Sequence, residues 1–209
     1  SAILLQTIIN QFNSNVDSIV LGIYTTTGIV AMYSLVIQLY HIYGSLSTAI
    51  SSIYQPKVSN MVFRGESDRK VTESLVEPSR FQLFILLLTL SGFALFGNNF
   101  IALWVGDKYS AIYPITLILL TSSTLELSQN TITNVLKAKN LLHGQTFILA
   151  GSTAVNFILT LLLVPRFGAI GAAAGTAFSM IFGYGIGLNL YYHFKAGIQM
   201  RYYYKKVLE

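Results

Sequence analysis

Charged residues are rare in this 209-residue sequence, and they gather in short clusters separated by long uncharged runs. The chain contains 13 Lys and Arg residues and 8 Asp and Glu residues, while 53% of its residues are hydrophobic. Residues 81–106 and 167–192 carry no ionised side chain, and each run exceeds the about 20 helical residues that cross a bilayer core. The sequence therefore predicts an all-α, polytopic membrane protein.

Six transmembrane helices are expected, joined by short connections that contain turn-forming residues. They are predicted over residues 2–23, 28–62, 71–103, 110–136, 141–164 and 169–194. Together they would form one transmembrane domain over residues 1–194, followed by a basic, aromatic tail over residues 195–209. A helix over residues 28–62 would be about 50 Å long, so its end should project into water.

The Lys and Arg residues are divided unevenly among the connections. The second and fourth connections and the tail hold Lys57, Arg64, Arg69, Lys70, Lys137, Lys139, Lys195, Arg201, Lys205 and Lys206. The other connections hold only Lys108 and Arg166. Because cytoplasmic connections are enriched in Lys and Arg, both ends of the segment are expected in the cytoplasm. The net charge of +5 is thus assigned to membrane orientation, and no nucleic-acid partner is expected.

The sequence offers nothing that resembles an enzyme site. It has no Cys, and its three His residues are scattered over separate segments, which disfavours a metal site. Motifs of serine hydrolases, phosphate-binding loops and zinc proteases are absent from the sequence. We expect no enzyme, no metal and no cofactor, with H⁺ or Na⁺ as the only small ion to consider.

Polar residues recur at spacings of three and four on several predicted helices, which places them on one face of each helix. The candidate substrate or ion cavity residues are Asn10, Asn13, Asp17, Gln38, His41, Glu126, Asn130 and Asn156. Polar groups that face lipid are costly, so these stripes should face inward. They either line a wet cavity or form hydrogen bonds between helices.

Two acids, Asp17 and Glu126, lie within apolar spans. Such acids are functional candidates, as carriers of H⁺ or Na⁺ or as substrate contacts. The alternatives are an acid at the outer membrane interface for Asp17 and a salt bridge or hydrogen bond to a neighbouring helix for Glu126. His41 could relay protons, because histidine is the side chain suited to proton transfer near neutral pH; a buried, hydrogen-bonded histidine is the alternative.

Small residues follow the last predicted helix at intervals of four. They are Gly171, Gly175, Ser179, Gly183 and Gly187. A ridge of this kind lets another helix approach closely, so we expect a packing role.

Several stretches, spread over nearly the whole chain, resemble motifs of the polysaccharide (O-antigen and oligosaccharide) flippases. They include DSIVLG at residues 17–22, IVAMYS at 29–34, LWVG at 103–106 and GAIGAAAGT at 168–176. That family belongs to a superfamily with the multidrug and toxin extrusion (MATE) transporters, whose members have two six-helix halves. The resemblance implies that this chain is the C-terminal half and that its partner is the missing N-terminal half.

The resemblance also implies a function in the bacterial inner membrane. It suggests that an undecaprenyl-pyrophosphate-linked oligosaccharide is flipped across the membrane for surface polysaccharide such as the O-antigen of lipopolysaccharide. Alternating access coupled to a cation would drive this step, with the lipid-linked oligosaccharide and membrane lipids as partners. The alternatives are a MATE-type drug/cation antiporter and, less favoured because every connection is short, a membrane glycosyltransferase or polymerase.

Overall fold

The computed structural model describes Gln11 and residues 15–209, and the regular elements in these residues are all helices. A helical segment over residues 15–24 precedes α2 (Thr27–Phe63), α3 (Asp68–Val105) and the short 3₁₀ helix η1 (Asp107–Tyr109). Then follow α4 (Ile112–Ser128), α5 (Ile132–Ala138), α6 (Leu142–Met180), the π-helical η2 (Ile181–Leu188), α7 (Asn189–Phe194) and α8 (Met200–Leu208).

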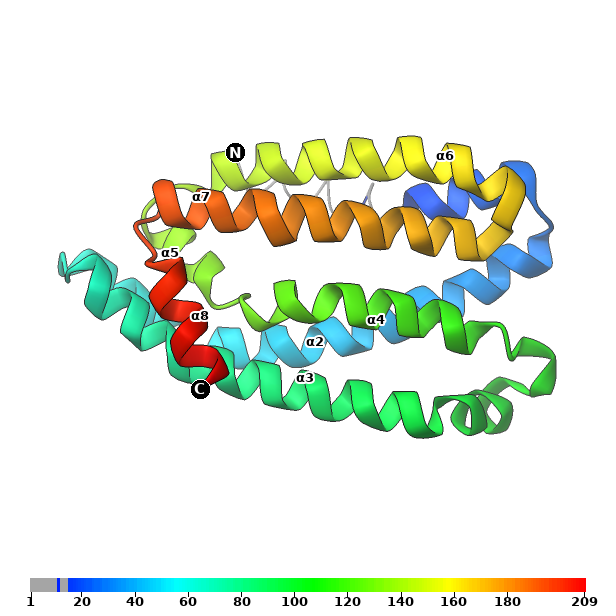
Figure 1. Cartoon of the computed structure of the whole chain (residues 1–209), viewed down its shortest axis with the longest axis horizontal. Coiled ribbons are helices and arrows are strands. Elements are labelled where there is room, and N and C mark those ends of the chain that lie inside the picture. Colours follow the sequence, from blue (N-terminus) through cyan, green and yellow to red (C-terminus); the bar gives the residue numbers. More distant parts are fainter. Residues whose placement is uncertain (1–10, 12–14) are drawn as a thin grey trace.

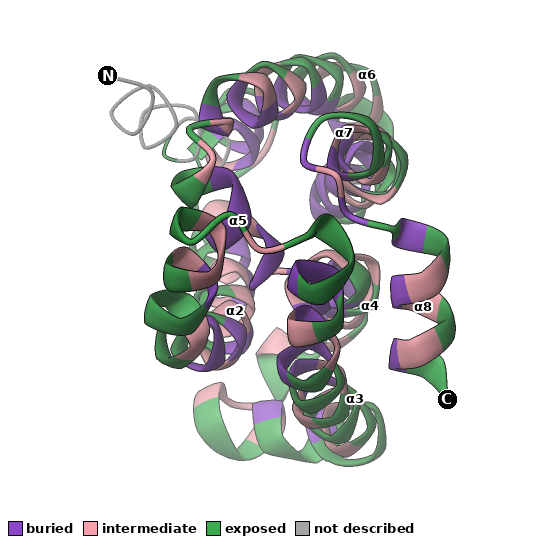
Figure 2. Ribbon diagram, turned by 90° about the vertical axis from the view of Figure 1, so that its left-hand side faces the viewer, coloured by how far each residue is buried: buried purple, intermediate pink, exposed green. Residues whose placement is uncertain are grey.

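The long helix α6 doubles back on itself at Gly168 (Figure 1). This residue has φ 56° and ψ −135°, a conformation that glycine adopts at little cost. The two arms are packed together, since the Ser152 hydroxyl on the first arm donates to the Ser179 carbonyl on the second at 2.8 Å. The resulting hairpin lies over a layer formed by α2, α3 and α4 (Figures 1 and 2).

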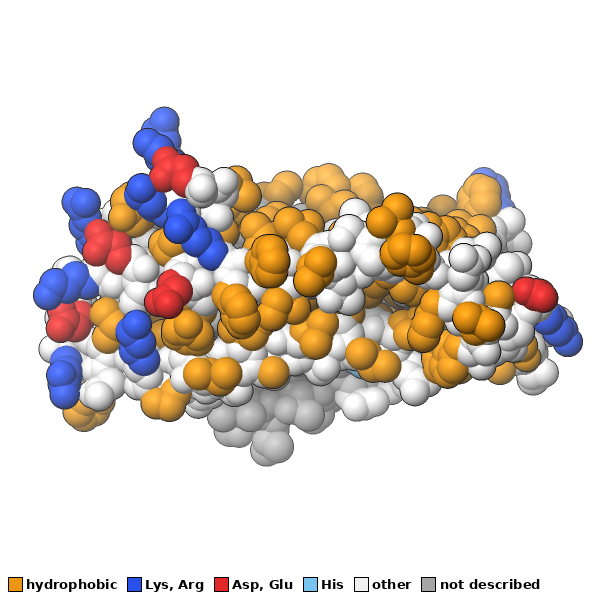
Figure 3. Space-filling view, turned by 90° about the horizontal axis from the view of Figure 1, so that it is seen from below, with side chains coloured by type: hydrophobic (Ala, Val, Ile, Leu, Met, Phe, Trp, Pro, Cys, Tyr) orange, Lys and Arg blue, Asp and Glu red, His pale blue; other side chains and the backbone are white. Residues whose placement is uncertain are grey.

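Three helical segments of the described part are long and apolar enough to cross a membrane: α2, α3 and residues 142–194, of which the last reverses direction at Gly168. The third includes the hairpin of α6, and α4 is a shorter apolar helix. Hydrophobic side chains cover the middle of the molecule, whereas Lys and Arg gather at its ends (Figure 3). The chain is thus an all-helical, multi-pass membrane protein; the count of six crossings stays a prediction.

The helix expected over residues 110–136 is wrong in one respect, because it is broken at residues 129–131. The polar side chains of the break bond to other helices. The Gln129 amide donates to the Tyr204 hydroxyl, and the Thr131 hydroxyl donates to Gln82 Oε1 at 3.2 Å. These side-chain bonds stabilise the break, where the backbone forms turn-type hydrogen bonds in place of α-helical ones.

Two further features were not expected from the sequence. Residues 181–188 form a π-helix within the last long helix, and the expected tail contains α8. The buried face of α8, which includes Met200 and Tyr203, lies in one apolar cluster with residues of α5 and of the start of α3. A second apolar cluster, containing Leu21, Tyr33 and Ala172, closes the end of the bundle near Gly168. The candidate site lies between these two packed ends.

Candidate functional site: a polar cavity beside a buried carboxylate

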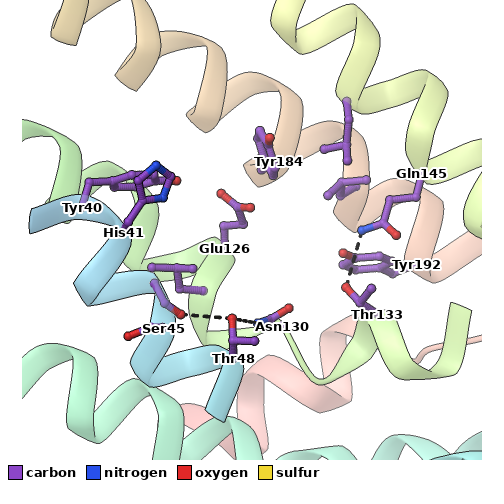
Figure 4. Close-up of a pocket in the computed structure, with 14 residues that line it drawn as sticks. Tyr40, His41, Ser45, Thr48, Glu126, Asn130, Thr133, Gln145, Tyr184 and Tyr192 are labelled. Carbon is purple, nitrogen blue, oxygen red and sulfur yellow. Dashed lines mark hydrogen bonds between the residues drawn. The ribbon is translucent and has the colours of Figure 1, made fainter. Parts of the chain in front are cut away.

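A cavity of about 520 Å³ lies between the hairpin and the layer that contains α2 and α4 (Figure 4). Its lining residues are Tyr40, His41, Gly44, Ser45 and Thr48 of α2, Glu126 and Leu127 of α4, Asn130, Thr133 of α5, Gln145 and Leu149 of α6, Tyr184 and Leu188 of η2, and Tyr192 of α7. Hydroxyl, amide and carboxyl groups from elements far apart in the sequence therefore meet in one space inside an apolar bundle.

Glu126 projects from α4 into this cavity (Figure 4). Its Oε2 atom is buried and has no hydrogen-bond partner among the described residues. The same holds for Oε1 of Gln145, whose amide nitrogen donates to Thr133 Oγ1 at 3.5 Å. The cavity wall thus presents two acceptor atoms that the described residues leave unbonded.

The polar face of α2 is only partly enclosed. His41 and Thr48 line the cavity, where Thr48 accepts a hydrogen bond of 3.3 Å from the Asn130 amide. His41 is exposed, and its role stays a prediction. Ser34 and Gln38 are exposed as well and do not line the cavity, contrary to the expectation that the whole α2 stripe faces inward.

Asp17 is buried nearer the Gly168 end of the bundle, with 2% of its surface exposed. The Tyr33 hydroxyl donates to Asp17 Oδ2 at 2.6 Å, and the Thr176 hydroxyl donates to the same atom at 2.7 Å. The Thr160 hydroxyl donates to Oδ1 at 3.1 Å, and Asn156 also bonds to the carboxylate. These partners come from α2 and from both arms of α6, so Asp17 ties together segments that are distant in sequence.

A small void of about 30 Å³ lies next to Asp17 and extends toward the larger cavity. Tyr40 and His41 line both spaces and so form the wall between them. Asp17 is therefore a buried group close to the cavity, and its functional role stays a prediction. Asn10 and Asn13, also expected in the cavity, lie outside the described residues.

The small residues of the second α6 arm and of η2 lie against the first arm of α6. A Cβ on Gly171 would approach the Leu163 carbonyl oxygen to 2.6 Å, and one on Gly183 would collide with the Ser152 side chain. A Cβ on Gly175 would lie 3.2 Å from Thr160 Oγ1. Gly187 and Ser179 lie against the same arm, through Ile148 and Ser152.

Sequence reasoning did not select several cavity residues, above all Tyr40, Tyr184 and Tyr192. Tyrosines suit membrane interfaces, and nothing in their spacing sets these three apart. Gln145 lies on the same polar stripe as Asn156, and this stripe is the sequence pattern that could have identified Gln145 as a cavity residue. No group of three or more His, Cys, Asp or Glu side chains able to hold a metal ion occurs in the part of the chain that the structure describes.

Residues 1–114 match a protein family described as "Polysaccharide biosynthesis protein". The chain is 30% identical over 177 residues to the probable flippase AglR of Haloferax volcanii, covering 80% of this chain and 35% of that protein. It is 26% identical over 173 residues to the probable low-salt glycan biosynthesis flippase Agl15 of the same organism, with the same coverage of 80% and 35%. The chain thus spans about a third of the length of these curated relatives. No solved structure matches it significantly.

Proposed function

Since this chain belongs to the polysaccharide biosynthesis protein family, and its curated relatives are flippases and not enzymes, we propose that it is one lobe of a transporter that moves a lipid-linked glycan across the cytoplasmic membrane. The observation that carries the proposal is a half-open cavity with polar lining residues that lies between apolar helices. Such a cavity can shelter hydroxyl-rich groups while a lipid tail stays in the bilayer.

The exposed polar stripe on α2 supports the assignment as a lobe. Ser34, Gln38 and Ser45 are all exposed on this transmembrane helix. Polar groups that face lipid are costly, so we propose that another part of the transporter covers this stripe. In this proposal the chain crosses the membrane six times, both ends of the segment are cytoplasmic, and a second six-helix half completes the pathway.

Transport is proposed to be coupled to H⁺ or Na⁺ at Asp17. An ionised carboxylate buried in a bundle needs a counter-charge, and none of the described ion pairs involves Asp17. Binding of H⁺ or Na⁺ would supply it, and Thr160, Thr176 and Asn156 place further oxygen atoms beside the carboxylate, the ligand type that hard cations prefer. Because both arms of α6 hold Asp17, occupancy by the ion would act on the hairpin that borders the cavity.

The finer identity of the substrate is an inference from the family resemblance. We propose undecaprenyl pyrophosphate as the lipid carrier and the bacterial inner membrane as the location, with surface polysaccharide as the end product. One acid among three tyrosines would also suit an organic cation, which keeps drug antiport as the second candidate function.

The test is made in cells that lack the intact gene. Loss of translocation predicts that full-length lipid-linked glycan accumulates on the cytoplasmic leaflet while surface glycan disappears. Restoration by the wild-type gene and failure of Asp17→Asn to restore export would support the coupled flippase. Unchanged lipid-linked glycan together with raised sensitivity to cationic drugs would instead support the antiporter.

A further inference from the structure

Resting on the proposed function, we propose that the cavity between α2, α4 and the hairpin is a subsite for an uncharged sugar unit of the glycan, and that the phosphate end of the substrate binds elsewhere. The side chains that line the cavity suit a sugar better than a phosphate.

The first support is the pair of unbonded acceptors. Glu126 Oε2 and Gln145 Oε1 are buried and have no hydrogen-bond partner among the described residues, although both residues line the cavity. Buried polar atoms are normally bonded, and each one left unbonded costs about 1–3 kcal/mol. A ligand rich in hydroxyl groups, such as a sugar, supplies the donors that these two oxygens need.

The second support is the set of aromatic side chains beside these acceptors. Tyr184 and Tyr192 lie beside Glu126 and Gln145, and Tyr40 lies on the α2 side (Figure 4). A tyrosine offers a flat apolar face and a hydroxyl tip in one side chain. This combination matches a sugar ring, which has apolar C–H faces and polar edges. The volume of about 520 Å³ falls within the range of about 300–1,000 Å³ usual for ligand pockets.

The third support is the absence of Lys and Arg side chains from the cavity wall. None of its lining residues is Lys or Arg, and its one acidic side chain offers a phosphate no counter-charge. Proteins commonly bind phosphate with Arg or Lys side chains, which on this chain gather at the ends of the molecule (Figure 3). The cavity therefore suits the sugar and disfavours the pyrophosphate.

The test uses the intact transporter in lipid nanodiscs, which avoids glycoside detergents. Two probes are titrated by calorimetry: the cell's own glycan, released from its lipid without phosphate, and inorganic pyrophosphate. Gln145→Leu removes one acceptor and should weaken glycan binding about tenfold while leaving any pyrophosphate binding unchanged. The matched control is Gln55→Leu, because Gln55 is an exposed α2 residue outside the cavity and its replacement should leave both affinities as they are.

A second variant tests whether the ligand is uncharged. Glu126→Gln keeps one acceptor oxygen, so the glycan affinity should fall less than in Gln145→Leu. Loss of binding in this variant would overturn the proposal, because charge and not hydrogen bonding would then drive recognition. Unchanged glycan affinity in a folded Gln145→Leu protein, or a wild-type protein that binds no glycan, would also overturn it.

Translocation of the intact lipid-linked glycan, measured in parallel, separates the two proposals. Translocation without any effect of Gln145→Leu on glycan binding would reject the subsite and keep the flippase. A wild-type transporter that does not translocate the glycan would reject the flippase itself.

Discussion

Asp17 and Glu126 are both acids within apolar helices, yet the structure places them in opposite environments. Both oxygens of Asp17 accept hydrogen bonds from hydroxyl groups on other elements. One oxygen of Glu126 has no partner among the described residues and borders a cavity of about 520 Å³. A fully bonded acid holds helices together and can respond to an ion, whereas an unbonded acceptor beside open space is available to a ligand.

The largest expected effect comes from removing the bonded acid. Asp17→Leu would leave the hydroxyls of Tyr33, Thr160 and Thr176 without their acceptor, so we expect the free energy of unfolding to fall by about 3–5 kcal/mol. Unfolding of the intact transporter by SDS titration in mixed micelles would measure this. A loss below about 1 kcal/mol would contradict the structural half of the comparison.

A smaller loss of stability is expected when the two arms of the hairpin that holds Asp17 are forced apart by an added side-chain atom. Gly171→Ala would place a Cβ 2.6 Å from the Leu163 carbonyl oxygen, and such overpacking typically costs about 1–3 kcal/mol. Gly151→Ala is the matched control, since a Cβ there has no neighbour within 4 Å and alanine favours a helix. Equal stability of the two variants in the same titration would show that the hairpin is not tightly packed.

Tyr204 on α8 ties the helix break beside the cavity to α7. Its hydroxyl accepts from Gln129 in the helix break and donates to Asn189 Oδ1 at 3.0 Å. Tyr204→Phe should therefore cost about 1 kcal/mol and speed amide hydrogen exchange in α8. Tyr202→Phe is the control, because its hydroxyl makes only a 3.5 Å contact with Glu73 at the surface. Exchange in α8 that is equally fast in both variants would rule out this tie.

The smallest effect on stability is expected at the unbonded acid. Glu126→Gln removes a charge without removing a hydrogen bond of its Oε2 atom, so the free energy of unfolding should stay within about 0.5 kcal/mol of the wild type. Unfolding in the same SDS titration provides the measurement. A loss of stability as large as that of Asp17→Leu would show that Glu126, like Asp17, holds the fold together, and would contradict the comparison.

The sequence was sufficient for the helical class and for several helix bounds. The helices predicted over 28–62 and 71–103 agree with α2 and α3 to within a few residues, and the connection left between the helices predicted over 141–164 and 169–194 contains the reversal of α6 at Gly168. It was not sufficient for the break at residues 129–131, because the partners that stabilise it, Gln82 and Tyr204, come from distant elements. Local periodicity carries no information on such long-range bonds.

The candidate site shows the same limit. Asp17 and Glu126 were both recognisable as acids in apolar spans, but their roles depend on partners that no spacing along one helix reveals. Thr160 and Thr176 meet Asp17 only because Gly168 folds α6 into a hairpin. Tyr184 reaches the cavity because η2 runs beside α4, and Tyr192 reaches it from α7, which continues from η2.

The most direct test of the account is translocation of the lipid-linked glycan by the intact transporter in proteoliposomes, with and without an imposed H⁺ or Na⁺ gradient. We expect a gradient to accelerate the wild type and Glu126→Gln, and to have no effect on Asp17→Asn, which lacks the carboxylate proposed to bind the ion. Gradient-driven translocation by Asp17→Asn would contradict the account, because Asp17 would then be a structural acid only.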